Sequence, residues 1–180
     1  GPWAWIKSWG DLLLYTNSVG MVQHFFYIIL IIDIVLGIIP GLHLLASMGS
    51  KLLSGTKDIS TKRLFVNYAY AYIPLGLMLW VGFNFSLLMI EWSYIPVVLS
   101  DPFGAGWNLL GTTHLPWMPI ALPIPIAEVA FALSGVLLSL KVGYNSLIAI
   151  YPNRKQAVRA LIPFAILTTA IAIVYVWFYI

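Results

Sequence analysis

Four long apolar stretches dominate the chain, at residues 21–48, 64–90, 124–150 and 160–180. Each is at least as long as the roughly 20 apolar residues that a helix needs to cross the hydrocarbon core of a bilayer. Only 8% of the residues are charged, whereas soluble domains carry about 25%. This composition excludes a soluble globular domain, a disordered tail and a nucleic-acid-binding module. We therefore predict an all-α integral membrane protein, with residues 1–180 forming a single membrane domain of four transmembrane helices.

The segment before the first apolar stretch is aromatic and mixed in polarity. Within residues 1–20, five apolar side chains recur on one helix face: Trp5, Ile6, Trp9, Leu12 and Leu13. Tryptophan rings favour the boundary between lipid and water. We therefore expect an N-terminal interfacial helix over residues 1–20. The alternative is a loop that packs on a partner subunit.

Prolines, glycines and small residues mark special positions along the predicted spans. Gly37, Pro40 and Gly41 follow Asp33 in the first span and predict a kink, and Pro74 lies in the first half of the second span. Small residues on helix faces allow close helix packing, and the second span offers four: Ala69, Ala71, Gly76 and Gly82.

A long segment, residues 91–123, separates the second and third spans and is rich in Pro, Gly and Trp. Within it, Asp101 precedes a proline and is expected to accept hydrogen bonds from nearby backbone amides in a turn. Three glycines are expected to form tight backbone turns: Gly104, Gly106 and Gly111. We predict a long outer loop between helices 2 and 3.

The distribution of basic residues predicts the orientation. Seven of the nine Lys and Arg residues lie in loops 49–63 and 151–159, and segment 91–123 has none. Because basic loops stay in the cytoplasm, we expect these two loops on the cytoplasmic side of the plasma membrane. Both termini and segment 91–123 are then expected outside.

Four ionisable residues are candidates for a cofactor-binding role near a quinol or a haem: Asp33, Glu128, His24 and His114. Charged groups inside a membrane are costly, so they are functional candidates by default. For Asp33 the alternative is a hydrogen bond to a neighbouring helix, and for Glu128 it is capping a neighbouring helix. His24 and His114 are both predicted on the outer side, where a metal or haem between them is conceivable. The alternative for His114 is an ordinary hydrogen bond within the loop.

Haem ligation between the two remaining histidine pairs is geometrically unfavourable. His24 and His43 are separated by roughly 28 Å along one helix at 1.5 Å per residue, so they cannot share a metal.

The chain has no cysteine, which excludes cysteine-ligated iron–sulfur clusters, thiolate zinc sites and thiol catalysis within it. No phosphate-binding loop, nucleophile elbow or zinc-protease helix appears, so we predict no metal site and no catalysis by this chain alone.

Two stretches carry a resemblance. They are FVNYAYAYIPLG at residues 65–76 and LSDPFGAGWNLLGT at residues 99–112. Together they resemble the C-terminal transmembrane region of membrane-bound polyferredoxin-like proteins. That group includes the membrane iron–sulfur subunits linked to periplasmic nitrate reductase and to nitrous-oxide reductase maturation. The resemblance covers residues 62–180.

The resemblance implies a subunit of a redox complex, with two departures. The relatives carry cysteine clusters, which are missing here, and many carry a histidine before the asparagine where this chain has Phe83 before Asn84. What the resemblance then implies is the membrane scaffold and a quinol-facing surface, with quinone or haem b as the candidate cofactor.

We therefore predict a membrane-embedded accessory or anchor subunit of a multi-subunit respiratory or other redox complex, with a contribution to a quinol-facing pocket. Its expected partners are other membrane subunits, an extracytoplasmic or redox-active partner and lipid, and not nucleic acid. The alternatives are a haem-b-bearing quinol-oxidising subunit and a small transporter or channel. Against the transporter, the sequence shows no inverted repeat.

Overall fold

The computed structural model describes residues 19–56 and 58–179, and this part of the chain is helical and contains no strand. Four helical stretches are long and apolar enough to cross a membrane: Phe25–Ser54, Thr61–Glu91, Ile124–Ile148 and Arg154–Phe178. The prediction of an all-helical chain with four candidate spans is confirmed. The predicted interfacial helix falls almost entirely outside the described residues. The elements are α2 (Val19–Asp33), η1 (Ile34–Ile38), α3 (Ile39–Ser54), α4 (Thr61–Ala71), α5 (Ile73–Glu91), α6 (Tyr94–Ser100), α7 (Ile124–Ile148) and α8 (Arg154–Tyr179).

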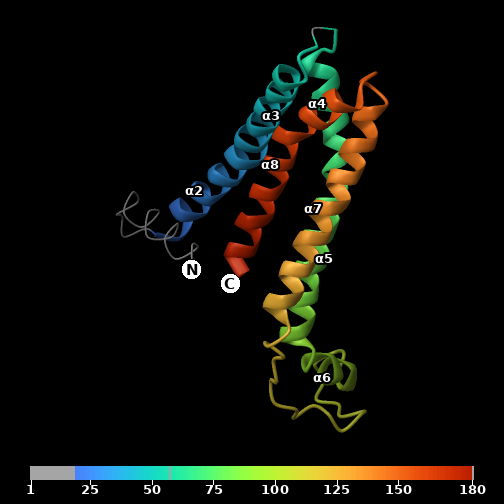
Figure 1. Ribbon diagram of the computed structural model, residues 1–180. Coiled ribbons are helices and arrows are strands. Elements are labelled where there is room, and N and C mark those ends of the chain that lie inside the picture. The colour runs from blue at the N-terminus through green and yellow to red at the C-terminus, as the bar shows by residue number, and fades with distance from the viewer. Residues whose placement is uncertain (1–18, 57, 180) are drawn as a thin grey trace.

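The helices form a bundle in which α7 packs between α5 and α8, and α8 packs in turn on α3 (Figure 1). The first candidate span, Phe25–Ser54, is different, because α2 leaves the bundle (Figure 1). Only 6% of the most apolar 18-residue stretch of this span is buried. Almost every described side chain from Phe25 to Leu42 is exposed or only partly buried. Among the described residues, the first span therefore packs on the bundle through α3.

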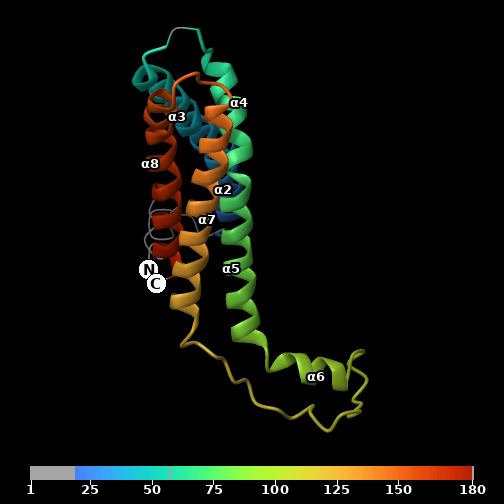
Figure 2. The same cartoon turned by 45° about the vertical axis from the view of Figure 1, so that its right-hand side comes forward.

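The two basic connections lie at the same end of the bundle. Figure 1 shows the turn after α3 and the turn between α7 and α8 together at the top, whereas α6 and the coil after it lie at the bottom. The start of α2 and the end of α8 also point away from the basic end (Figures 1 and 2). The helices extend further than predicted, so Lys51, Lys62 and Arg154 lie within helix ends rather than in loops.

A π-helical turn interrupts the first span where the sequence predicts a kink. The Ile39 amide donates to the Ile34 carbonyl, which spans five residues instead of four. Pro40 follows in the first turn of α3. Proline has no N–H, and its ring clashes with the carbonyl four residues earlier, here that of Leu36. The wider π turn accommodates this clash without ending the helix.

Pro74 divides the second span into α4 and α5, with Tyr72 between them. The Leu75 amide lies in the first turn of α5 and donates to Ser139 Oγ of α7 over 2.9 Å. Beside this bond, Gly135 of α7 packs closely, since a Cβ there would lie 3.2 Å from the Leu75 Cα. The break in the second span is thus held against α7.

The segment between α5 and α7 folds back on the end of α5. Figure 2 shows α6 running sideways from that end. The indole N–H of Trp117 donates to the Ile90 carbonyl over 3.0 Å, and the Ile120 amide donates to the Met89 carbonyl over 2.9 Å. The turn after α6 is built as predicted: Asp101 accepts from the amides of Ala105 and Gly106, at 2.9 and 2.8 Å.

The three glycines of this segment have positive φ angles, which confirms the expected tight turns: Gly104 at 64°, Gly106 at 80° and Gly111 at 72°.

Candidate functional site

Asp33 is the last residue of α2 and directly precedes the π turn. Its side chain is exposed, and it folds along its own helix, because a Cβ on Gly37 would lie 3.0 Å from its Oδ1. No hydrogen bond joins Asp33 to another helix within the described residues, so the alternative of a bond to a neighbouring helix of this chain finds no support there. The carboxyl group instead lies on the unpartnered surface of the first span.

The two histidines that were predicted on the outer side, His24 and His114, are not joined by any described contact. His114 is exposed in the coil between α6 and α7. His24 lies on α2, and its side chain lies outside the described part of the structure. Figures 1 and 2 show α2 and the coil after α6 on separate parts of the molecule. In the described ranges 19–56 and 58–179, no three His, Asp or Glu side chains gather as a metal site would require.

Glu128 is fully buried, although it lies only about one turn inside the start of α7. The Ser86 hydroxyl of α5 donates to its Oε1, whereas its Oε2 has no hydrogen-bond partner among the described residues. Gly82 of α5 provides the space, because a Cβ there would lie 2.7 Å from Oε2. The same Cβ would lie 3.1 Å from the Tyr175 hydroxyl of α8. Three helices therefore converge on this carboxyl group.

A second polar site contains two residues that are not among the predicted site residues, His43 of α3 and Tyr72 between α4 and α5. His43 Nε2 lies 2.8 Å from the Phe65 carbonyl oxygen, and its Nδ1 lies 3.3 Å from the Tyr72 hydroxyl. A carbonyl oxygen only accepts, so Nε2 carries the proton. Neutral Nδ1 is then the acceptor for the Tyr72 hydroxyl, which leaves the tyrosine oxygen with a lone pair to accept from a ligand.

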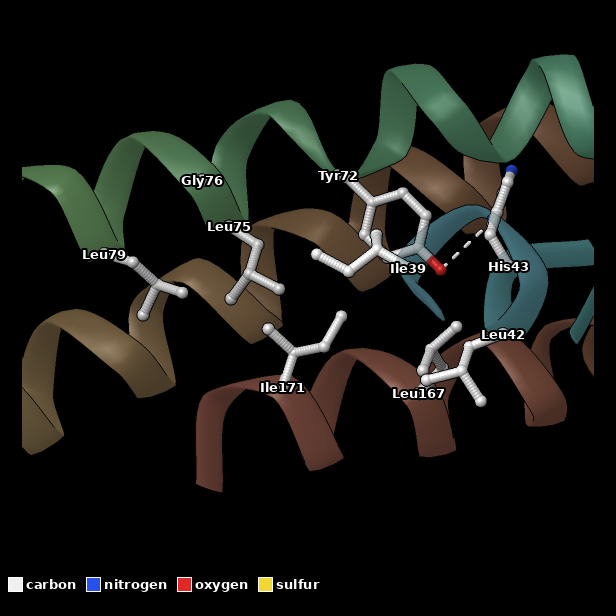
Figure 3. Close-up of a pocket in the computed structure, with 9 residues that line it drawn as sticks. All are labelled: Ile39, Leu42, His43, Tyr72, Leu75, Gly76, Leu79, Leu167 and Ile171. Carbon is white, nitrogen blue, oxygen red and sulfur yellow. Dashed lines mark hydrogen bonds between the residues drawn. The ribbon is translucent and has the colours of Figure 1, made fainter. Parts of the chain in front are cut away.

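Figure 3 shows this pair at one end of an apolar pocket of about 250 Å³. Aliphatic side chains from α3, α5 and α8 form the rest of the lining: Ile39, Leu42, Leu75, Leu79, Leu167 and Ile171. Gly76 leaves one wall open, since nothing lies within 4 Å of the position of a Cβ on it. The volume is slightly below the ~300–1,000 Å³ of typical ligand pockets, which suits a single ring with its tail outside.

Contacts with two aromatic rings also hold the His43 imidazole in place. Its ring centroid lies 4.2 Å from that of Phe65 and 5.1 Å from that of Tyr72. The residue is 6% exposed, and both of its nitrogens are engaged within the chain. An imidazole with both nitrogens in use is not available as a haem ligand without breaking one of these bonds.

The chain matches no protein-family model, no curated protein and no solved structure. The chemistry of the two sites is therefore inferred from their own side chains. Glu128 is a buried carboxyl group with one oxygen that accepts no hydrogen bond from the described residues. The His43–Tyr72 pair is a hydrogen-bonded acid–base couple that faces an apolar pocket.

Proposed function

We propose that the chain is a membrane-embedded subunit of a multi-subunit respiratory or other redox complex, and that its His43–Tyr72 pocket holds the ring of a quinol. One observation carries the proposal: a His–Tyr hydrogen bond at the end of an otherwise apolar pocket between α3, α5 and α8. A quinol has the matching chemistry, with hydroxyl groups on a flat apolar ring and an apolar tail. Pockets of this kind use a few polar groups to orient a mostly apolar ligand.

The pair offers a route for one proton. A quinol hydroxyl donates to the Tyr72 oxygen, and as the quinol releases its proton to that oxygen, Tyr72 passes its own to His43 Nδ1. The imidazolium that results is stabilised by the Phe65 carbonyl at Nε2, 2.8 Å away. One electron leaves with this proton and passes to a redox centre in a partner subunit, since this chain has no cysteine to hold an iron–sulfur cluster.

The exposed first span supports assembly with other membrane subunits. Asp33 lies on a helix whose neighbouring side chains are apolar and exposed, including Ile32 at 51% and Leu36 at 72%. Lipid tails offer no hydrogen bonds to a carboxyl group, so a partner helix with a basic or hydroxyl side chain is its natural neighbour. The resemblance to polyferredoxin-like proteins supports the same proposal, with the clusters supplied by another subunit.

We propose the orientation from the positions of the basic residues. Lys51, Lys62, Arg154 and Arg159 all belong to the helix ends that share one side of the bundle in Figure 1. On the positive-inside rule this side faces the cytoplasm. The opposite end, with α6 and the coil that follows it, then faces outward and is available to an extracytoplasmic partner.

Photolabelling with an azidoquinone tests the pocket. We expect labelled peptides from α3 and from the start of α5, and we expect Tyr72→Phe to weaken labelling about fivefold, because one hydrogen bond is worth about 1 kcal/mol. The control is Tyr70→Phe, since Tyr70 is 63% exposed and lies away from the pocket. Labelling that is equal in both variants contradicts the proposal.

Purification from native membranes in mild detergent, followed by native mass spectrometry, tests the assembly. We expect a species much heavier than 20.1 kDa that contains redox-active subunits. Asp33→Asn is expected to lower the yield of that complex, whereas Asp58→Asn, in an exposed turn, is not. A single species of 20.1 kDa without partners contradicts the proposed role.

A further inference from the structure

The buried carboxyl group of Glu128 has no charge to balance it. No Lys, Arg or His forms an ion pair with it within residues 19–56 and 58–179, and its Oε2 accepts no hydrogen bond there. The side chain is 0% exposed. An ionised carboxylate in such surroundings is far more costly than a neutral carboxylic acid. The arrangement therefore favours a bound proton over a bare charge.

The neighbouring groups on the helices packed against Glu128 are compatible with a neutral carboxylic acid. On α5 these are Ser86 and Gly82, which has no side chain to occupy the space in front of Oε2. On α8 the titratable group is Tyr175, whose hydroxyl donates to the Leu79 carbonyl over 2.9 Å. None of these groups is a cation that would hold the carboxyl group ionised.

Ser86 joins Glu128 to a cavity at the end of the bundle. This cavity has a volume of about 340 Å³ and lies where the coil after α6 enters α7. Its lining combines Ser86 with apolar residues of α5 and of the entry to α7: Phe83, Leu87, Ile90, Ala121, Ile124 and Pro125. Ser86 is thus the residue that both lines the cavity and bonds the carboxyl group.

We propose that Glu128 is a proton-binding site that exchanges its proton with the cavity through the Ser86 hydroxyl. A hydronium ion in the cavity gives a proton to Ser86 Oγ while the Ser86 hydroxyl proton moves to Glu128 Oε1. The products are a water molecule, an intact serine and a neutral carboxylic acid, and release follows the same steps in reverse. The site stands on the packing of α5, α7 and α8 and does not depend on quinol binding at His43.

Infrared spectroscopy of the full chain in lipid nanodiscs tests the proton. The chain has two glutamates, Glu91 and Glu128, and Glu91 is exposed at the end of α5. In Glu91→Gln protein grown with ¹³C-labelled glutamate, every glutamate signal comes from Glu128. We expect the isotope-sensitive band at neutral pH to be the C=O stretch of a protonated carboxylic acid. A band in the position of an ionised carboxylate overturns the proposal.

Deuterium exchange of the same band tests the route. After transfer to D₂O the protonated acid band shifts, and we expect Ser86→Ala to slow this shift several-fold. The matched control is Ser134→Ala on α7, because the Ser134 hydroxyl donates to the Phe131 carbonyl of its own helix over 2.8 Å. Exchange that is as fast in Ser86→Ala as in Ser134→Ala overturns the role of Ser86.

Discussion

Tyr68 of α4 and Phe164 of α8 stack almost face to face, with ring centroids 4.7 Å apart and ring planes 10° from parallel. Both side chains are fully buried. The Tyr68 hydroxyl donates to the Ala160 carbonyl over 2.6 Å and lies 2.9 Å from Ser50 Oγ on α3. A single side chain therefore connects three helices near the basic end of the bundle.

Tyr68→Phe is expected to destabilise the bundle by about 1 kcal/mol, because it keeps the stack but removes the hydroxyl from buried partners. Tyr68→Ala is expected to cost about 3–5 kcal/mol, since it also leaves a cavity. The control is Tyr70→Phe, whose ring is exposed. Denaturant unfolding in mixed micelles measures these differences, and equal stability of the two Phe variants would contradict the role of the Tyr68 hydroxyl.

Ser139→Ala is expected to destabilise the protein by about 1–3 kcal/mol, because it removes the acceptor of the buried Leu75 amide. The same change is expected to increase hydrogen exchange at that amide. Ser134→Ala again serves as the control on α7, since its hydroxyl bonds within its own helix. Unchanged exchange at the Leu75 amide in Ser139→Ala would show that the bond contributes nothing.

Two glycines of α5 are expected to respond in opposite ways to substitution by alanine. Gly82→Ala is expected to destabilise the protein, because it places a Cβ 2.7 Å from Glu128 Oε2. The carboxyl group must then move, and its hydrogen bond from Ser86 is disturbed. Gly76→Ala meets nothing within 4 Å and is expected to stabilise the helix by about 0.5–1 kcal/mol. Thermal unfolding of the two variants is the measurement. A Gly82→Ala protein as stable as the Gly76→Ala protein would contradict the close packing of Gly82 against Glu128.

Asp101→Ala is expected to loosen the turn after α6 without affecting the bundle. The carboxylate holds the Ala105 and Gly106 amides, and hydrogen bonds to a charged group contribute about 1.5–3 kcal/mol each. Limited proteolysis is expected to cut the variant faster between α6 and α7. Cleavage at the wild-type rate in the variant would show that the turn holds without this carboxylate.

The four candidate spans were predictable because their signal is local: apolar length decides whether a segment can cross a bilayer. The Asp101 turn was predictable for the same reason, since its donors lie four and five residues ahead. Local sequence did not reveal which small residues pack closely. Ala71 and Gly82 are buried, whereas Ala69 is exposed and Gly76 has no close neighbour.

The His43–Tyr72 pair could not be predicted, because its members are 29 residues apart on helices whose relative rotation no local pattern defines. Two signals were available: His43 is an ionisable residue inside a predicted span, and Pro74 breaks the second span next to Tyr72. Glu128 was predicted as a candidate from its depth. Its pairing with Ser86, 42 residues away, depends on the packing of α5 on α7.

The π turn before α3 shifts the phase of the first span. An extra residue in one turn rotates the following side chains by roughly 100° relative to an uninterrupted α-helix. The stripe that α3 buries against the bundle includes His43, Ser47 and Ser50, whereas no described side chain from Phe25 to Asp33 is buried. The first span thus presents two separate faces, and a substitution on the exposed α2 surface is expected to leave the contacts of α3 with α8 unchanged.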